Sequence, residues 1–323
     1  MGAATGAEFS SHLAAVLTAP APLAATLLPL ASGFGYVVGV LLVKRASVHG
    51  VGLWRTAFIS NLAMGLFFAP LWLLGGQPFD PACLWQPLLF AALFFTGQVF
   101  TFAALAGDVS LATPVLGLKI LFVAVASSLL LNDAVRPTWW LAAALATAAA
   151  ILLQWVPRAS AGLVPVKPAA GAPHPRRTVL LASLAALAYA LADVLLQRFT
   201  PVWGSGRFLP LAFGVVALLS FGLIPFFHAP LRAVPSAAWP WLLPGAVMLA
   251  VQASGMAWTM GNYGRATAAN ILYSTRGLWS VLAVGLLGGW LGTAGERKLP
   301  PGVFRRRLVG AVLMFAAIAL VTV

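Results

Sequence analysis

The sequence predicts an all-α integral membrane protein with ten transmembrane helices in two inverted five-helix repeats. Apolar residues make up 61% of the 323-residue chain, charged residues make up 8%, and ten apolar stretches are each long enough to cross a bilayer. A membrane-spanning helix needs about 20 apolar residues, whereas soluble domains are about one quarter charged. The composition therefore excludes a secreted disulfide scaffold, a disordered chain and an ordinary soluble enzyme.

The apolar stretches are too long for strands, and none shows the period-two alternation of a membrane β-barrel. Tryptophans such as Trp72, Trp140 and Trp290 fall near the expected ends, where indole rings favour the bilayer interface. We expect spans at 22–43, 50–74, 86–106, 110–131, 137–156, 178–199, 207–228, 239–262, 266–291 and 303–323.

A basic, proline-rich linker divides the chain. Residues 157–177 contain five prolines and four Lys or Arg residues, a composition that prevents a continuous helix. We therefore expect an N-terminal tail at 1–21, a first five-helix repeat at 22–156, the linker at 157–177 and a second five-helix repeat at 178–323.

The two halves coincide at rare polar residues, which is more informative than the alignment of apolar residues. Because five is an odd number, the second copy of a five-span unit enters the membrane from the opposite side. This architecture is typical of secondary transporters, whose binding sites lie near the midplane between the repeats. Alignment of 33–45 with 186–198 pairs Tyr36 with Tyr189, and alignment of 107–119 with 264–276 pairs Lys119 with Arg276.

Local patterns around the third and fourth spans are specific enough to suggest a family. The third span ends in Ala-Leu, small residues open the fourth, a proline follows, and an acidic residue closes it: Ala104-Leu105, Ser110-Leu111-Ala112, Pro114 and Asp133. With Trp54-Arg55 early in the second span, these patterns resemble the EamA-like branch of the drug/metabolite transporter superfamily. Asp133 departs from the family's usual Glu, and the second half matches more loosely, with Asn270-Ile271 in the proline region and Glu296 placed late.

The resemblance implies a ten-helix transporter with both termini in the cytoplasm. The charge distribution predicts the opposite orientation. Connections that follow odd-numbered spans carry 12 Lys or Arg residues and those that follow even-numbered spans carry four. By the positive-inside rule, the odd connections are cytoplasmic and both termini are outside. The sequence leaves this conflict open.

Two basic residues are candidates for a solute site. Lys119 and Arg276 each lie about ten residues into a span, which places them about 15 Å deep, near the bilayer midplane. An unpaired charge at that depth costs at least about 2.5 kcal/mol. The two cations could face an anion, such as a carboxylate or phosphate, across one cavity. Alternatively, each pairs with an internal acid, for which Asp193 is the obvious partner, and fixes helix packing.

Other polar and aromatic residues are expected near these cations. Asp193 is either a proton carrier or, as we favour, a counter-ion for Lys119 or Arg276. Helical spacing places Tyr273, Trp279 and Ser280 beside Arg276, although the two aromatic residues could serve packing alone. Further candidates for substrate contact are Asn270, which could instead cap a kink, Tyr36 and Tyr189 at matching positions, and Gln98 and Gln252, which could instead bridge helices.

The sequence therefore favours a secondary transporter that moves a small organic solute, with an anion as one option, by alternating access. A lipid-head-group flippase of the same fold is an alternative. A membrane-embedded lipid-modifying enzyme is disfavoured, because all four histidines fall in tails or connections and the acids are scattered singly. We expect no enzymatic activity, cofactor, metal centre or nucleic-acid partner. The expected partners are the solute and the lipid bilayer, and the Ala-, Gly- and Pro-rich composition suggests a bacterial inner membrane.

Overall fold

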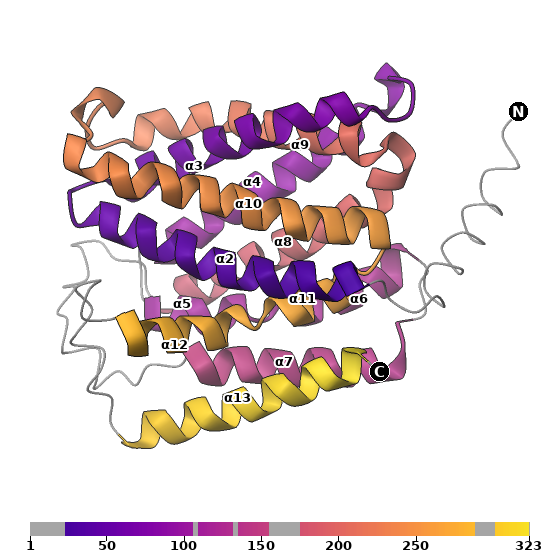
Figure 1. The fold of residues 1–323 in the computed structure, drawn as a ribbon, viewed down its shortest axis with the longest axis vertical. Coiled ribbons are helices and arrows are strands. Elements are labelled where there is room, and N and C mark those ends of the chain that lie inside the picture. Colours follow the sequence, from indigo (N-terminus) through magenta and orange to yellow (C-terminus); the bar gives the residue numbers. More distant parts are fainter. Residues whose placement is uncertain (1–22, 106–108, 132–134, 155–174, 288–300, 323) are drawn as a thin grey trace, which may run out of the picture.

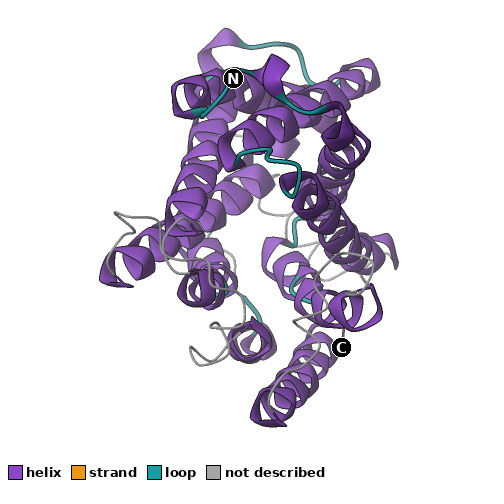
Figure 2. Cartoon of the chain, turned by 90° about the vertical axis from the view of Figure 1, so that its left-hand side faces the viewer, coloured by secondary structure: helices purple, strands orange, loops and turns teal. Residues whose placement is uncertain are grey.

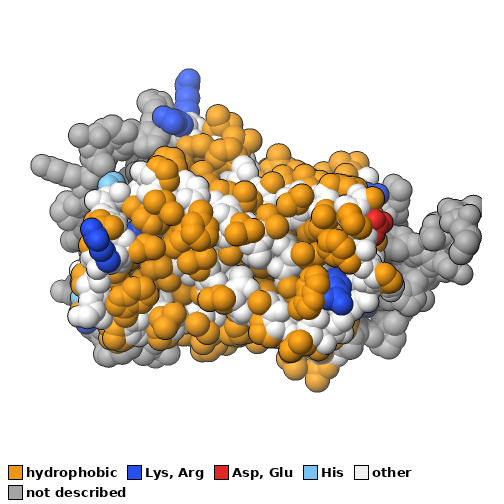
Figure 3. Space-filling view, turned by 90° about the horizontal axis from the view of Figure 1, so that it is seen from above, with side chains coloured by type: hydrophobic (Ala, Val, Ile, Leu, Met, Phe, Trp, Pro, Cys, Tyr) orange, Lys and Arg blue, Asp and Glu red, His pale blue; other side chains and the backbone are white. Residues whose placement is uncertain are grey.

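The computed structural model describes residues 23–105, 109–131, 135–154, 175–287 and 301–322, and this part of the chain forms helices and turns without a β-strand. Eight of its helical segments are long and apolar enough to cross a membrane. Hydrophobic side chains cover the middle of the face in Figure 3, and Lys and Arg side chains lie toward its two ends. These are the features of an integral membrane protein.

The helices of the first half follow the expected spans closely. The third and fourth elements along the chain are 3₁₀-helices, and the fourth predicted span is divided into two α-helices. The elements are α2 (Leu23–Ser47), α3 (Leu53–Phe68), η1 (Ala69–Leu74), η2 (Pro81–Cys83), α4 (Trp85–Leu105), α5 (Val109–Leu116), α6 (Lys119–Leu130) and α7 (Pro137–Gln154).

The second half has a similar order, again with a divided helix, but its described residues form three 3₁₀-helices where those of the first half form two. Its last two predicted spans, 266–291 and 303–323, correspond to helices that are not among the eight segments above. The elements are α8 (Pro175–Trp203), α9 (Ser205–Leu219), η4 (Ser220–Phe226), η5 (Leu231–Ala233), η6 (Ser236–Ala238), α10 (Trp239–Tyr263), α11 (Ala266–Tyr273), α12 (Arg276–Leu287) and α13 (Pro301–Thr322).

Prolines account for three of the departures from the expected boundaries. The spans 50–74 and 207–228 were expected to be continuous, but each changes from α to 3₁₀ geometry near Pro70 or Pro225. Proline lacks the N–H that continues an α-helix. The linker was expected to reach residue 177, whereas α8 begins at Pro175. That correction also follows from proline chemistry, because proline is well suited to the first helical position.

The helices form a layered array, with α3 and α9 in the top layer of Figure 1 and α7 and α13 in the bottom layer. The strongest contacts join α2 with α10, α4 with α8, and α7 with α13. Figure 2 views the array after a 90° turn, closer to the helix axes, and shows helices as its only regular structure in the described residues. The divided helices α5–α6 and α11–α12 contact α8 and α2, respectively.

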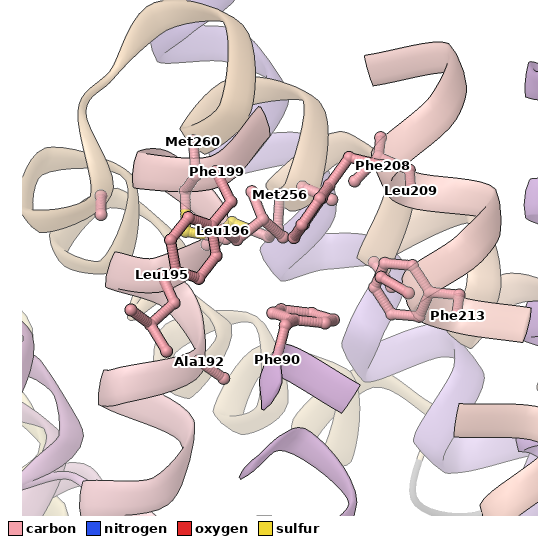
Figure 4. Packing of buried hydrophobic residues seen from close by; sticks show 14 of the residues in the cluster. Phe90, Ala192, Leu195, Leu196, Phe199, Phe208, Leu209, Phe213, Met256 and Met260 are labelled. Atoms are coloured by element: carbon pink, nitrogen blue, oxygen red, sulfur yellow. The ribbon is translucent and has the colours of Figure 1, made fainter. Parts of the chain in front are cut away.

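The largest apolar core lies where α4, α8, α9 and α10 meet (Figure 4). Phe68 stacks on Phe213 with 4.0 Å between ring centroids, and Phe90 meets Phe213 edge to face. The α8 segment is the most buried of the eight, at 56% of its apolar window. A polar side chain on the inner face of α8 is therefore held away from lipid.

Candidate functional site

The first divided helix breaks immediately before Lys119. Gly117 and Leu118 form a turn between α5 and α6, and the N–H of Gly117 donates to the Pro114 carbonyl at 3.0 Å. A Cβ at position 117 would lie 2.9 Å from that carbonyl oxygen, so the close approach requires glycine. Lys119 thus becomes the first residue of a new helix in the middle of the span.

The second divided helix breaks immediately before Arg276. Ser274 and Thr275 separate α11 from α12, and their hydroxyl groups donate to the carbonyls of Ile271 and Leu272. Hydroxyl groups that bind nearby carbonyls compete with the helical ladder and bend helices. The two breaks therefore use different chemistry, but each places a cation at the first residue of the following helix.

Lys119 is held in an ion pair. Its Nζ lies 2.7 Å from Asp193 Oδ2 on α8 and 5.7 Å from the centre of the Tyr189 ring. Asn270 on α11 also donates from Nδ2 to Asp193 Oδ2, at 2.7 Å. Three helices thus converge on one carboxylate, whose residue is 6% exposed. This geometry favours the counter-ion interpretation of Asp193, with Lys119 as its partner.

Arg276 has aromatic neighbours instead of an acid. Its guanidinium carbon lies 4.9 Å from the Tyr36 ring centre and 4.8 Å from that of Tyr273. The described residues contain two carboxylates: Asp193, which pairs with Lys119, and Asp80, which caps η2 through the N–H of Ala82. Among those residues, none forms a salt bridge with Arg276. Its positive charge is therefore uncompensated by a described acid.

A small pocket contains both cations. Its cavity volume is about 20 Å³, roughly the space of one water molecule. The lining comes from α5, α6, α7, α11 and α12 and the two breaks: Leu116, Gly117, Lys119, Ile120, Ala150, Gln154, Asn270, Tyr273, Ser274 and Arg276.

The structure brings most of the predicted site residues together. Lys119, Arg276, Asn270 and Tyr273 line the pocket. Asp193, Tyr36 and Tyr189 contact one or other of the cations, and three of the four tyrosines of the chain therefore belong to this cluster.

Four other predicted site residues lie away from the pocket lining. Trp279 is 37% exposed and meets Phe34 edge to face, and Ser280 is exposed on the next position of α12. Gln98 exchanges two 2.9 Å amide hydrogen bonds with Asn61. Gln252 donates to the Leu249 carbonyl in its own helix. The arrangement at Gln98 matches the alternative that it bridges helices, here α3 and α4.

The pocket also contains residues that the sequence did not single out. Gln154, at the last position of α7, donates from Nε2 to the Ala150 carbonyl at 3.1 Å and lines the pocket. In the sequence, the one indication of Gln154 was a polar amide near the end of an apolar span. Ser274 and Gly117 belong to the breaks, which hydropathy does not reveal. Asp133 and Glu296, the acids compared with the family pattern, lie outside the described residues.

No protein-family model and no curated protein matches this sequence. A solved structure, described only as the crystal structure of a protein, is similar over 92% of this chain and 95% of its own, with a TM-score of 0.67 and 17% sequence identity. At this level of identity the similarity shows a shared fold across nearly the whole chain, and it carries no information about activity.

Proposed function

We propose that this protein is a secondary transporter that moves a small organic solute by alternating access, with a preference for anions. The observation that carries the proposal is that Lys119 and Arg276, matched in the internal alignment, line one pocket deep among apolar helices. Buried ionisable groups in membrane proteins are costly and generally mark solute or ion pathways. The EamA-like resemblance of the sequence supports the same class, and we propose membership of that branch with ten spans.

The pattern of helix contacts supports the proposed inverted repeat. Exchanging the halves replaces α2 by α8 and α10 by α4, so the α2–α10 contact becomes the α4–α8 contact, and both are among the strongest. The α3–α9 and α7–α13 contacts each map onto themselves. The cation contacts exchange as well, because Lys119 with Tyr189 becomes Arg276 with Tyr36.

The helix breaks supply a means of opening the pocket. Discontinuous helices at the midplane are a recurring feature of transporters with inverted repeats, in which one repeat or bundle rocks against the other. The pocket is too small for an organic solute as it stands, so binding requires movement of the surrounding helices. Gln154, at the end of α7, lines this pocket together with Lys119 and Arg276.

The test is transport by the purified chain in proteoliposomes. Organic anions, cations and neutral solutes that raise its melting temperature would first be selected, because binding to the folded state stabilises it. Uptake of the radiolabelled solute should then be saturable and should disappear in Arg276→Gln. Arg198→Gln is the matched control, because Arg198 is exposed, binds the Leu130 carbonyl and is not part of the pocket lining.

The outcome that would contradict this proposal is a stabilising solute that is never transported. A labelled phospholipid assay on the same vesicles tests the flippase alternative. Rapid exchange of lipid between leaflets, without solute uptake, would replace the transporter proposal by that alternative.

A further inference from the structure

We propose that the pocket selects anions with a single negative charge, that Arg276 binds this charge, and that Lys119 acts through Asp193 as a positioning residue. This inference rests on the proposed transport function and names the class of solute. It depends on the charges of three side chains. Among the residues that the structure describes, two cations and one acid face the site, so within this part of the chain one positive charge remains to be neutralised by the solute.

The positive charge of Lys119 is already neutralised by Asp193. Asp193 receives hydrogen bonds from Lys119 Nζ and Asn270 Nδ2, both at 2.7 Å and both on the same oxygen. A solute that captured Lys119 would leave a buried carboxylate without its counter-ion, and breaking such a pair is strongly unfavourable. The ion pair therefore resists exchange with an incoming anion.

The charge of Arg276 is available. Its described partners are the rings of Tyr36 and Tyr273 and the Tyr273 hydroxyl, none of which carries a compensating charge. A guanidinium offers a planar fork of N–H donors that matches a carboxylate, and it can keep an aromatic ring on its face while it does so. The site is thus suited to a monocarboxylate or a similar monoanion.

One of the differences between the aligned halves explains why the site retains one positive charge. The alignment that pairs Tyr36 with Tyr189 places Val40 opposite Asp193. Lys119 lies beside Tyr189 of α8, and Arg276 lies beside Tyr36 of α2. One turn after the tyrosine, α8 carries an acid and α2 does not. If both repeats carried the acid, both cations would be neutralised and the pocket would have no preference for anions.

The experiment measures thermal stabilisation and binding by the full-length purified protein with solutes that differ in charge. The probes with one negative charge are benzoate and butyrate, and those with two are terephthalate and succinate. Benzamide is the neutral probe and benzylammonium is the cationic probe. Wild-type protein should bind a monoanion more tightly than its doubly charged, neutral or cationic counterparts. Arg276→Gln should weaken monoanion binding about tenfold or more, as expected for a lost charge-assisted hydrogen bond.

Charge substitutions at the ion pair make the test specific. Lys119→Ala leaves Asp193 to cancel Arg276 and should abolish monoanion binding. The double variant Lys119→Gln with Asp193→Asn restores the single positive charge and should recover it. Asp193→Asn alone frees Lys119 and should shift the preference toward terephthalate and succinate. Arg198→Gln should behave as wild type.

Three results would overturn the inference. In the first, no monoanion stabilises the wild-type protein, or the wild-type protein prefers another charge class. In the second, a folded Arg276→Gln variant keeps its affinity for monoanions. In the third, a folded Lys119→Gln/Asp193→Asn variant does not recover monoanion binding. Transport in proteoliposomes separates this inference from the function on which it rests. Charge-selective binding without transport would refute the transporter, whereas saturable transport of dianions or cations would refute the charge selection alone.

Discussion

The Lys119 ammonium and the Asp193 carboxylate lie 2.7 Å apart, between two helices deep in the bundle. The Lys119 side chain is 17% exposed and that of Asp193 is 9% exposed. In Asp193→Ala, the ammonium loses its counter-ion but stays desolvated. We expect the free energy of unfolding to fall by about 3 kcal/mol, the usual cost of breaking a buried pair. Thermal unfolding in detergent measures the change.

The matched control is the double substitution Lys119→Met with Asp193→Asn, which removes both charges and nearly conserves the volume of each side chain. Such replacements are often neutral or stabilising. Recovery of the melting temperature in the double variant would attribute the loss in Asp193→Ala to the isolated charge. If Asp193→Ala matched wild type, the pair would contribute nothing to stability.

The Asn61–Gln98 amide pair gives a second prediction. Each side chain both donates to and accepts from the other at 2.9 Å, so the pair joins α3 and α4. Gln98→Met should cost about 1–2 kcal/mol, because the amide of Asn61 loses its partner among apolar residues. The affinity for the transported solute should not change, since Gln98 lies outside the pocket lining. A lower affinity at unchanged stability would instead place Gln98 in the path of the solute.

The sequence was sufficient to predict where helices form. Hydropathy depends on side chains alone, so the expected spans and the helices agree within a few residues along most of the described chain. The rare polar residues also predicted the cluster around Lys119, Asp193 and Arg276, because a charge inside an apolar span needs a partner. Those inferences required the composition of each helix but not its orientation.

Side-chain direction could not be predicted to the same extent. Spacing placed Trp279 and Ser280 beside Arg276, but the break before Arg276 starts a new helix whose exposed face includes both residues. For Gln98 the sequence left open contact with substrate or a bridge between helices, because its partner, Asn61, lies 37 residues away and on another helix. Contacts between helices and interruptions within them depend on packing, which one sequence does not specify.

The contact of Gly33 with the second break gives a third prediction. A Cβ at position 33 would lie 3.1 Å from the Tyr273 carbonyl oxygen and 3.3 Å from the N atom of Arg276. Gly33→Ala should therefore push α2 away from the break, lower stability by about 1 kcal/mol and impair transport. Gly214→Ala is the control, because nothing lies within 4 Å of its added Cβ in the middle of α9. We expect it to be neutral or to stabilise by up to about 1 kcal/mol. Equal effects of the two substitutions would contradict the role of this contact.

Arg55 gives a fourth prediction, of opposite sign to the usual effect of losing a buried side chain. Arg55 is 5% exposed and donates from Nη2 to the Gly50 carbonyl at 2.8 Å, while its Nε and Nη1 atoms have no hydrogen-bond partner in the described part of the chain. Arg55→Met keeps most of the packing and removes donors that burial leaves unsatisfied. We expect the melting temperature to stay the same or rise. Arg207→Met should lower it, because the Arg207 guanidinium lies 4.1 Å from the Trp72 ring centre. A marked loss of stability in Arg55→Met would show that Arg55 is a structural anchor.

The orientation of the chain can be decided with its single cysteine. Cys83 lies in η2, next to Asp80, at the end of the bundle where the N–H of Gln77 donates to the Trp203 carbonyl. Ten spans would place both termini at this same end. Most of the basic residues that the structure describes lie toward the opposite end, among them Lys44, Arg45, Arg176, Arg177 and Arg232.

The positive-inside rule therefore predicts that Cys83 faces the outside. A membrane-impermeant maleimide should label Cys83 in intact cells. In a Cys83→Ser background, Ala233→Cys in η5, an exposed position at the basic end, should react only after the membrane is permeabilised. The reverse pattern would put the termini in the cytoplasm, as the EamA-like resemblance implies. The twelve basic residues of the odd connections would then face outward, against the positive-inside rule.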